Sequence, residues 1–271
     1  MGKLFQILTI LFVLSTTASA QLQDHSQETE PAAIRSFGGV VETRESANPD
    51  NLPVVYPVEE RLTVFSEMDE DFPYVEVAMR EPVFVLASDD NWLHVRTKGG
   101  ATGYVLSGSV SDFWIRVSKK ERTVRIYRGD DLHRTLPADL AINFFSNKVR
   151  KGGQENVDHW RTPEGVFYVV NKNPESQFHR AFVLNYPGVA EAERGLRHGM
   201  ISRDEYNQIV RADDRFEMPP MFTKLGGFIE IHGDGTGART NWTRGCIALR
   251  NDDIDELWDV IKVGTPVLIE K

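Results

Sequence analysis

The chain has 271 residues, a formal net charge of −9 and a single cysteine, Cys246. The acidic balance argues against nucleic acid or an anionic membrane as the main partner. One cysteine excludes an internal disulfide. The length is sufficient for two small domains.

Residues 1–20 have the pattern of a secretory signal peptide. The chain begins with a basic residue, Lys3, continues with an apolar segment over residues 4–14 and reaches Ala18-Ser19-Ala20. This apolar segment is shorter than the roughly 20 residues that a membrane-spanning helix needs. We therefore expect cleavage after Ala20, export to the periplasm or cell-wall space, and no membrane span after cleavage. Because Lys3 is the only charged side chain removed, the mature chain has a net charge of −10.

Residues 21–59 are rich in Gln, Glu, Ser, Pro and Asn, and their few apolar residues show no period. Such a composition buries too little apolar surface to offset the loss of chain entropy. It predicts a flexible linker that would let the folded part reach away from its surroundings.

Residues 60–113 are expected to form a small all-β domain. Alternating apolar and polar residues predict five short strands, over residues 61–66, 74–79, 82–88, 91–97 and 102–107. Trp92 with the alternating Leu93 and Val95, followed by the Gly-Tyr-Val of residues 103–105, resembles a bacterial SH3 domain. Another kind of small β-barrel is the alternative.

Residues 114–271 predict a second, mainly β domain with helices at its rim. Strands are expected over residues 114–118, 122–136, 165–173, 180–187, 227–233 and 266–271, with a turn at Gly129-Asp130. Ser202 and Glu205 form a capping box that begins a helical insert. Asn251 is predicted to cap a last helix, whose apolar residues follow at helical spacing: Ile254, Leu257, Trp258 and Ile261.

The segment around Cys246 contains the residue types that a catalytic thiol requires. Such a thiol needs a general base within hydrogen-bond reach and donors for an oxyanion. Alternation places His232 on the face opposite Ile229 and Ile231, and the thirteen residues between His232 and Cys246 include four glycines that allow the chain to turn back. Spacing alone leaves two interpretations open, a catalytic pair or a buried structural cysteine and histidine.

A family resemblance favours the catalytic interpretation. The stretch "IEIHGDG" followed by "WTRGCIALRNDDIDELW", and upstream "RTPEGVFYVVNKNPESQFHRAFVLNYP" (residues 161–187), resemble the L,D-transpeptidase (YkuD-type) catalytic domain. The expected fold class is therefore mainly β, a small SH3-like barrel followed by an L,D-transpeptidase-type β-sandwich with peripheral helices. The motif implies Cys246 as nucleophile and His232 as general base. By analogy, the backbone amides of Gly245 and Cys246 would form the oxyanion hole.

The resemblance also implies a substrate, the stem peptides of peptidoglycan. Candidate contacts are the motif residues Thr243 and Arg244, the strand-end residues Tyr186, His179 and Phe178, and Arg194 and Arg250. For the residues outside the motif, core packing or an exposed surface position is the alternative. The sequence departs from the family pattern at Arg244, where histidine is frequent, and at Ala248, where arginine is frequent.

The implied reaction is acyl transfer through a thioester on Cys246. Transfer of the diamino acid carbonyl to the amine of a second stem would give a 3–3 cross-link, or would attach a wall-linked lipoprotein. The alternatives are a peptidoglycan hydrolase or amidase, if water is the acceptor, and a wall-binding module without activity. No motif implies a cofactor or a metal: the acidic run after Arg250 is explained by a helix N-terminus, and no βαβ unit accompanies the glycines after His232.

Overall fold

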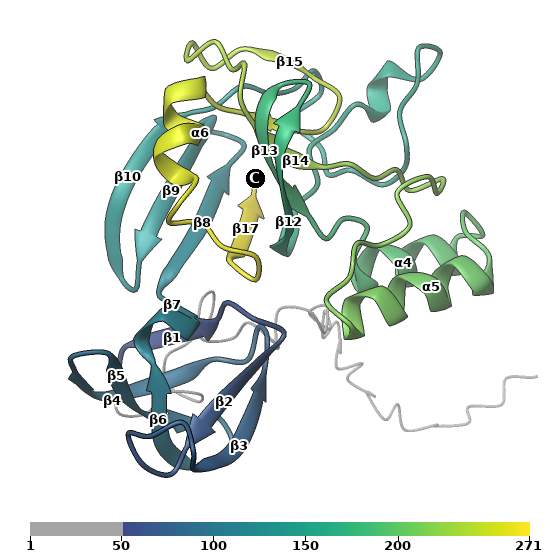
Figure 1. Ribbon diagram of the computed structural model, residues 1–271. Coiled ribbons are helices and arrows are strands. Elements are labelled where there is room, and N and C mark those ends of the chain that lie inside the picture. Colours follow the sequence, from purple (N-terminus) through teal and green to yellow (C-terminus); the bar gives the residue numbers. More distant parts are fainter. Residues whose placement is uncertain (1–50) are drawn as a thin grey trace, which may run out of the picture. The chain divides into compact units, whose positions relative to one another are not determined.

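The computed structural model describes residues 51–271, which form mainly β structure (Figure 1). The expected signal peptide and most of the expected linker lie outside the described residues. One part of the linker expectation is wrong: strand β1 (Val54–Pro57) lies within residues 21–59 and pairs with β4 and β7. Its consecutive residues Val55 and Tyr56 are both buried, which explains why this segment joins the sheet. Among the described residues, no helix is long and apolar enough to cross a membrane.

The first domain is a seven-stranded sheet in the order β3-β2-β6-β5-β4-β1-β7. After β1 it contains β2 (Arg61–Phe65), β3 (Pro73–Ala78), β4 (Val83–Asp89), β5 (Trp92–Thr97), β6 (Thr102–Leu106), the 3-10 helix η1 (Ser107–Ser109) and β7 (Val110–Ser111). All five predicted strands are confirmed. Its core consists mainly of valines that alternate along the strands.

Two residues that carry the SH3 resemblance pack β5 and β6 against β2. Trp92 packs edge-on against Phe65, with ring centroids 5.6 Å apart. A Cβ atom at Gly103 would lie 2.7 Å from Val64 Cγ1, so β6 approaches β2 at a distance that only glycine permits.

The second domain is built on an eight-stranded sheet in the order β10-β9-β8-β17-β12-β13-β14-β16. The strands are β8 (Phe113–Ser118), β9 (Thr123–Arg128), β10 (Asp131–Pro137), β12 (Gly165–Ser176), β13 (His179–Leu184), β14 (Glu230–His232), β16 (Ile247–Ala248) and β17 (Pro266–Glu270). A parallel pair, β11 (Leu140–Ala141) and β15 (Asn241–Thr243), lies beside it. The 3-10 helix η2 (Val157–His159) interrupts the connection to β12.

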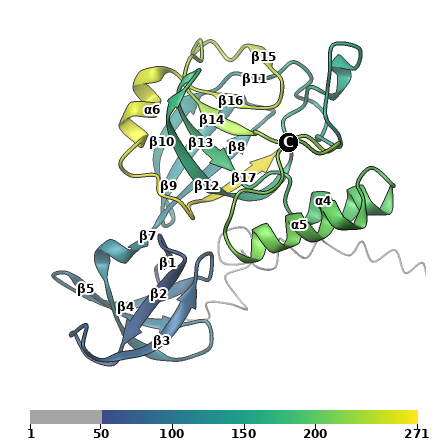
Figure 2. The ribbon, with the colours of Figure 1, turned by 45° about the vertical axis from the view of Figure 1, so that its right-hand side comes forward.

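Three α-helices border this sheet (Figure 2). Helices α4 (Val189–Arg197) and α5 (Arg203–Asp214) form the predicted insert, and the capping box of α5 is confirmed. Helix α6 (Asn251–Leu257) packs against β13 and buries Ile254 and Leu257. The prediction that Asn251 caps α6 is wrong. The N-cap residue is Arg250, because the Asn251 side chain instead accepts a hydrogen bond from the Asp234 amide at 2.6 Å.

Candidate active site

Parallel pairing of β14 and β16 brings Cys246 and His232 together. Ile231 lies opposite Ile247 and His232 lies opposite Ala248, so the same register places Cys246 beside Glu230. The Glu230 backbone lowers the pKa of the Cys246 thiol, as expected for such neighbours. Because Glu230 and His232 lie on one face of β14, the thiol and the imidazole are diagonal neighbours on one side of the sheet.

The His232 ring is buried and held on three sides. Nδ1 lies 2.7 Å from the Gly233 carbonyl oxygen, which can only accept, so Nδ1 carries the hydrogen and Nε2 is the nitrogen that can accept a proton. The Phe178 ring stacks on the imidazole with centroids 4.5 Å apart, and the Trp242 ring meets it edge-on at 6.0 Å. Burial lowers the pKa of His232, which keeps the ring neutral at pH 7.

The Cys246 thiol is half-buried and protonated at rest. Burial, together with the negative charge of Glu230, raises its pKa to about 12, against smaller lowering effects of the Glu230 backbone and the Lys148 ammonium. Its S–H donates to the Phe228 carbonyl oxygen at 3.3 Å. A neutral thiol beside a neutral imidazole requires proton transfer during the attack, in contrast to a preformed thiolate–imidazolium pair.

The turn before Cys246 is fixed by Thr243. The Thr243 hydroxyl donates to the Cys246 carbonyl oxygen at 2.6 Å and accepts from the Gly245 amide at 3.3 Å. Gly245 has φ +152°, and a Cβ there would lie 2.8 Å from Ile229 Cδ1. The position before the cysteine therefore excludes every residue with a side chain.

Two cavities meet at Cys246. The first, of about 590 Å³, is lined by Gln177, Phe178, Phe228, Glu230, His232, Trp242, Thr243, Arg244 and Cys246. The second, of about 230 Å³, is lined on its polar side by Lys148, Lys151, Gln154 and Arg244, and contains Gly245 and Cys246. The Arg244 guanidinium lies over the Trp160 ring, 5.0 Å from its centroid. The Cys246 thiol is therefore accessible from two sides.

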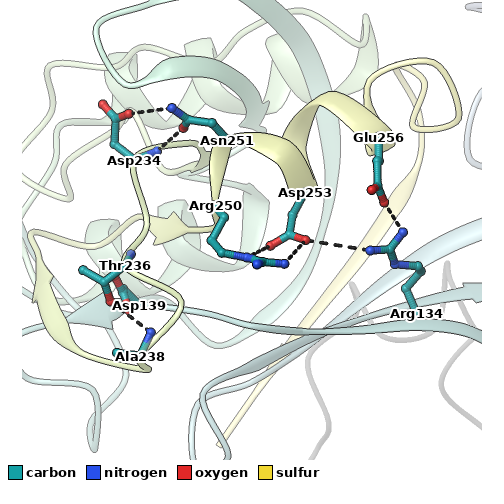
Figure 3. Close-up of polar contacts among 9 residues, drawn as sticks. All are labelled: Arg134, Asp139, Asp234, Thr236, Ala238, Arg250, Asn251, Asp253 and Glu256. Atoms are coloured by element: carbon teal, nitrogen blue, oxygen red, sulfur yellow. Dashed lines mark hydrogen bonds and ion pairs between the residues drawn. The ribbon is translucent and has the colours of Figure 1, made fainter.

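The loop between His232 and Cys246 is anchored by Asp139, which is fully buried. One of its carboxylate oxygens accepts from the Thr236 hydroxyl at 2.9 Å and the Thr240 amide at 2.8 Å. The other accepts from the Thr236 amide at 2.7 Å and from Trp242 Nε1 at 2.9 Å. Figure 3 shows Asp139 beneath this loop, next to Thr236. Asp139 thereby fixes the aromatic side chain that flanks His232.

Four candidate residues lie outside both cavities, and their contact with substrate stays a prediction. Tyr186 is fully buried and its hydroxyl donates to the Leu225 carbonyl oxygen at 3.0 Å. His179 pairs with Asp255 of α6 at 2.8 Å. Arg250 forms two hydrogen bonds of 2.9 Å with Asp253, as Figure 3 shows. Arg194 pairs with Glu191 at 3.5 Å and donates to the Lys148 carbonyl oxygen at 3.4 Å.

Other residues of the site carry no signal in the sequence. Lys148 lies in a basic run that is typical of a solvated loop, and Asp139 follows a strand with no motif around it. Glu230 is visible only as the alternation partner of His232, and burial raises its pKa. Within residues 51–271, no three His, Cys, Asp or Glu side chains are grouped so that they could hold a metal ion.

Comparison with known proteins identifies the family. A profile of the L,D-transpeptidase catalytic domain (YkuD) matches residues 112–269, and a profile of the bacterial SH3 domain matches residues 70–112. No curated protein matches the sequence. The first match covers more than half of the chain, which therefore belongs to the L,D-transpeptidase catalytic-domain family, with a bacterial SH3 domain before the catalytic domain.

Several solved structures match part of the chain. Bd1075 from Bdellovibrio bacteriovorus is 25% identical, with a TM-score of 0.38 over 59% of this chain and 48% of that chain. The helical cell shape determining protein Pgp2 from Campylobacter jejuni is 20% identical, with a TM-score of 0.39 over 59% and 47%. An L,D-transpeptidase from Xylanimonas cellulosilytica is 14% identical, with a TM-score of 0.35 over 59% and 61%. The chain thus spans about half the length of the first two.

Proposed function

We propose that this protein is an exported cysteine acyltransferase that acts on peptidoglycan stem peptides and forms 3–3 cross-links. The observation that carries the proposal is the placement of Cys246 and His232 on one face of two paired strands, at the junction of two cavities. The family supplies the substrate class. The chemistry follows from the residues themselves.

In the first half-reaction, His232 Nε2 accepts the proton of the Cys246 thiol as the sulfur attacks the carbonyl carbon of the diamino acid at position three. The C–N bond to the terminal D-alanine then breaks. The imidazolium returns its proton to the leaving amine, and a thioester remains on Cys246. The Gly233 carbonyl supports these proton transfers, because its hydrogen bond with His232 Nδ1 selects the reactive tautomer and stabilises the imidazolium.

The oxyanion of each tetrahedral intermediate needs hydrogen-bond donors near the thiol. The Cys246 amide is our first candidate. The Gly245 amide is the second, and it donates to the Thr243 hydroxyl at 3.3 Å in the resting protein. To act as a donor, the Gly245 amide would have to break its hydrogen bond to the Thr243 hydroxyl and donate to the oxyanion instead.

In the second half-reaction, a neutral amine attacks the thioester carbonyl carbon and forms a C–N bond as the C–S bond breaks. His232 Nε2 accepts the proton that the amine loses and returns it to the sulfur, which regenerates the Cys246 thiol. A cross-linking enzyme needs room for a second stem peptide, and the two cavities at Cys246 meet this requirement. Glu230 lines the larger cavity, where its carboxylate would attract the ammonium form of an incoming amine.

Hydrolysis of the thioester is the second candidate function. The larger cavity, at about 590 Å³, also has room for water beside the thiol. Water in place of the amine would yield a tripeptide and make the enzyme a peptidase. Ala248 does not separate the two candidates, because it is buried opposite His232 and lines neither cavity.

Incubation of the mature protein with disaccharide-tetrapeptides, followed by mass spectrometry of the products, tests this proposal. We expect a 3–3 linked dimer with release of D-alanine, and neither product with Cys246→Ala. Tripeptide monomers without dimers would assign the hydrolase function, and no product at all would refute both.

A further inference from the structure

The smaller cavity at Cys246 is strongly basic. Its charged lining residues within residues 51–271 are Lys148, Lys151 and Arg244, and all are cations. The larger cavity shares Arg244 but also contains the acidic Glu230. This asymmetry gives a bound peptide a direction, because a carboxylate is attracted more strongly to the first cavity than to the second.

Lys148 differs from the other two cations because it is buried, with 4% of its surface exposed. Its ammonium makes one hydrogen bond among the described residues, to the His159 carbonyl oxygen at a long 3.4 Å. An ammonium has three donors, and a buried cation normally has an anionic partner. No ion pair within residues 51–271 includes Lys148, so its ammonium has donors left to bind an anion.

The ammonium also lies next to the reacting atoms. The position that a Cβ of Gly245 would occupy is 3.6 Å from Lys148 Nζ. The backbone of Lys148 is fixed by Arg194, which donates to the Lys148 carbonyl oxygen. Because Gly245 directly precedes Cys246, any substrate group that contacts the Lys148 ammonium lies within a few ångströms of the scissile bond.

We propose that Lys148 binds the terminal carboxylate of the donor stem peptide and so restricts the enzyme to stems with a single residue beyond the scissile bond. The inference rests on the proposed function and names its specificity-determining residue. In such a peptide only the N–Cα and Cα–C bonds separate the scissile nitrogen from the carboxyl carbon, which matches the closeness of Lys148 to Gly245. A stem with a further residue would place a neutral amide against a buried cation, and that mismatch disfavours its binding.

The ionisation of Lys148 is compatible with this role. Burial lowers its pKa to about 8, against a raising effect of Cys246. The ammonium therefore remains mostly charged at pH 7. A bound carboxylate would stabilise the charged form further.

The test compares two substrates: a disaccharide-tetrapeptide with a free terminal carboxylate, and the same compound with a terminal carboxamide. For the wild-type protein we expect kcat/KM to be about ten- to a hundredfold higher for the acid than for the amide. Lys148→Met and Lys148→Gln should lose most of this ratio while retaining amide turnover within about threefold of wild type. Lys172→Met is the matched control, because Lys172 is also partly buried with a lowered pKa but lies over Trp258, outside both cavities. It should keep the wild-type ratio.

Three results would overturn the inference. Equal losses for acid and amide in the Lys148 variants would show that Lys148 serves the thiol or the fold. A ratio that survives in these variants would exclude it as the carboxylate site. A wild-type protein that turns over both substrates equally refutes the inference without any variant, whereas turnover of neither substrate refutes the proposed function itself.

Discussion

The anchoring of the loop before Cys246 makes Asp139→Asn an informative substitution. Each carboxylate oxygen of Asp139 accepts two hydrogen bonds from the loop. An asparagine has the same shape, but one of its two terminal groups is a donor. If the NH₂ group faces the Thr236 amide and Trp242 Nε1, both of those bonds are lost. If it faces the Thr240 amide and the Thr236 hydroxyl, the bond from the Thr240 amide is lost, whereas the hydroxyl can turn and accept from the NH₂ group.

The cost can be derived from these bonds. A buried donor left unpaired costs about 1–3 kcal/mol. Thr236 and Thr240 are exposed residues, so water can replace part of the loss. We therefore expect the free energy of unfolding to fall by about 2 kcal/mol. We also expect kcat/KM to fall about tenfold or more, because Trp242 would no longer be fixed against His232.

Urea unfolding followed by tryptophan fluorescence measures the free energy of unfolding, and turnover of a disaccharide-tetrapeptide measures kcat/KM. Asp234→Asn is the matched control, since within residues 51–271 the Asp234 carboxylate accepts a single hydrogen bond, from Asn251 at an exposed site. It should change stability by less than about 0.5 kcal/mol. Stability and activity of Asp139→Asn equal to those of the control would refute the role of Asp139 as anchor.

The pH dependence gives an independent check of the same group. Burial by itself favours the neutral acid, but the hydrogen bonds from Thr236, Trp242 and Thr240 outweigh it and hold the pKa of Asp139 below its usual range. The carboxylate therefore contributes stability that is fully present above the unfolded pKa of about 3.9 and is lost as the pH falls through the folded pKa. The stability difference between wild type and Asp139→Asn should shrink below about pH 4.

Further predictions concern the thiol and its surroundings. Alkylation of Cys246 by iodoacetamide should rise with pH through pH 10 without a plateau, because the thiol pKa is about 12; a plateau near pH 7 would show a preformed thiolate. Glu230→Gln should accelerate this alkylation at a given pH, since removal of the negative charge lowers the thiol pKa, and an unchanged rate would contradict that coupling. Gly245→Ala should reduce both stability, by about 2 kcal/mol or more in urea unfolding, and turnover, because the new Cβ would clash with Ile229 in a strained backbone. Tyr186→Phe should destabilise the fold by about 1 kcal/mol while leaving kcat/KM unchanged, and a loss of activity in a stable variant would return Tyr186 to the substrate site.

The longer strands of both domains were predictable from sequence because alternation along a strand reflects burial on one face. The short strands β1, β7, β11, β15 and β16 were not predicted. The pairing of Cys246 with His232 was predictable from a motif and from the glycines between them. The structure adds the reason: β14 and β16 pair in parallel, which no local pattern encodes.

The residues around this pair depend on packing between distant segments. Asp139 and Thr236 are 97 positions apart, and nothing near Asp139 marks it as an acceptor for that loop. Lys148 reaches the site through an irregular segment between β11 and β12. For Tyr186 the sequence left two alternatives, a groove residue or core packing, and the structure places its side chain in the core.

The central claim is that Cys246 carries the acyl group of a stem peptide. Intact-protein mass spectrometry of the wild type, quenched in acid during turnover of a disaccharide-tetrapeptide, tests it most directly. We predict a mass increase equal to the substrate minus D-alanine, located on Cys246 by peptide mapping and absent from Cys246→Ala. Turnover that persists in Cys246→Ala, or an adduct on another residue, would contradict the account.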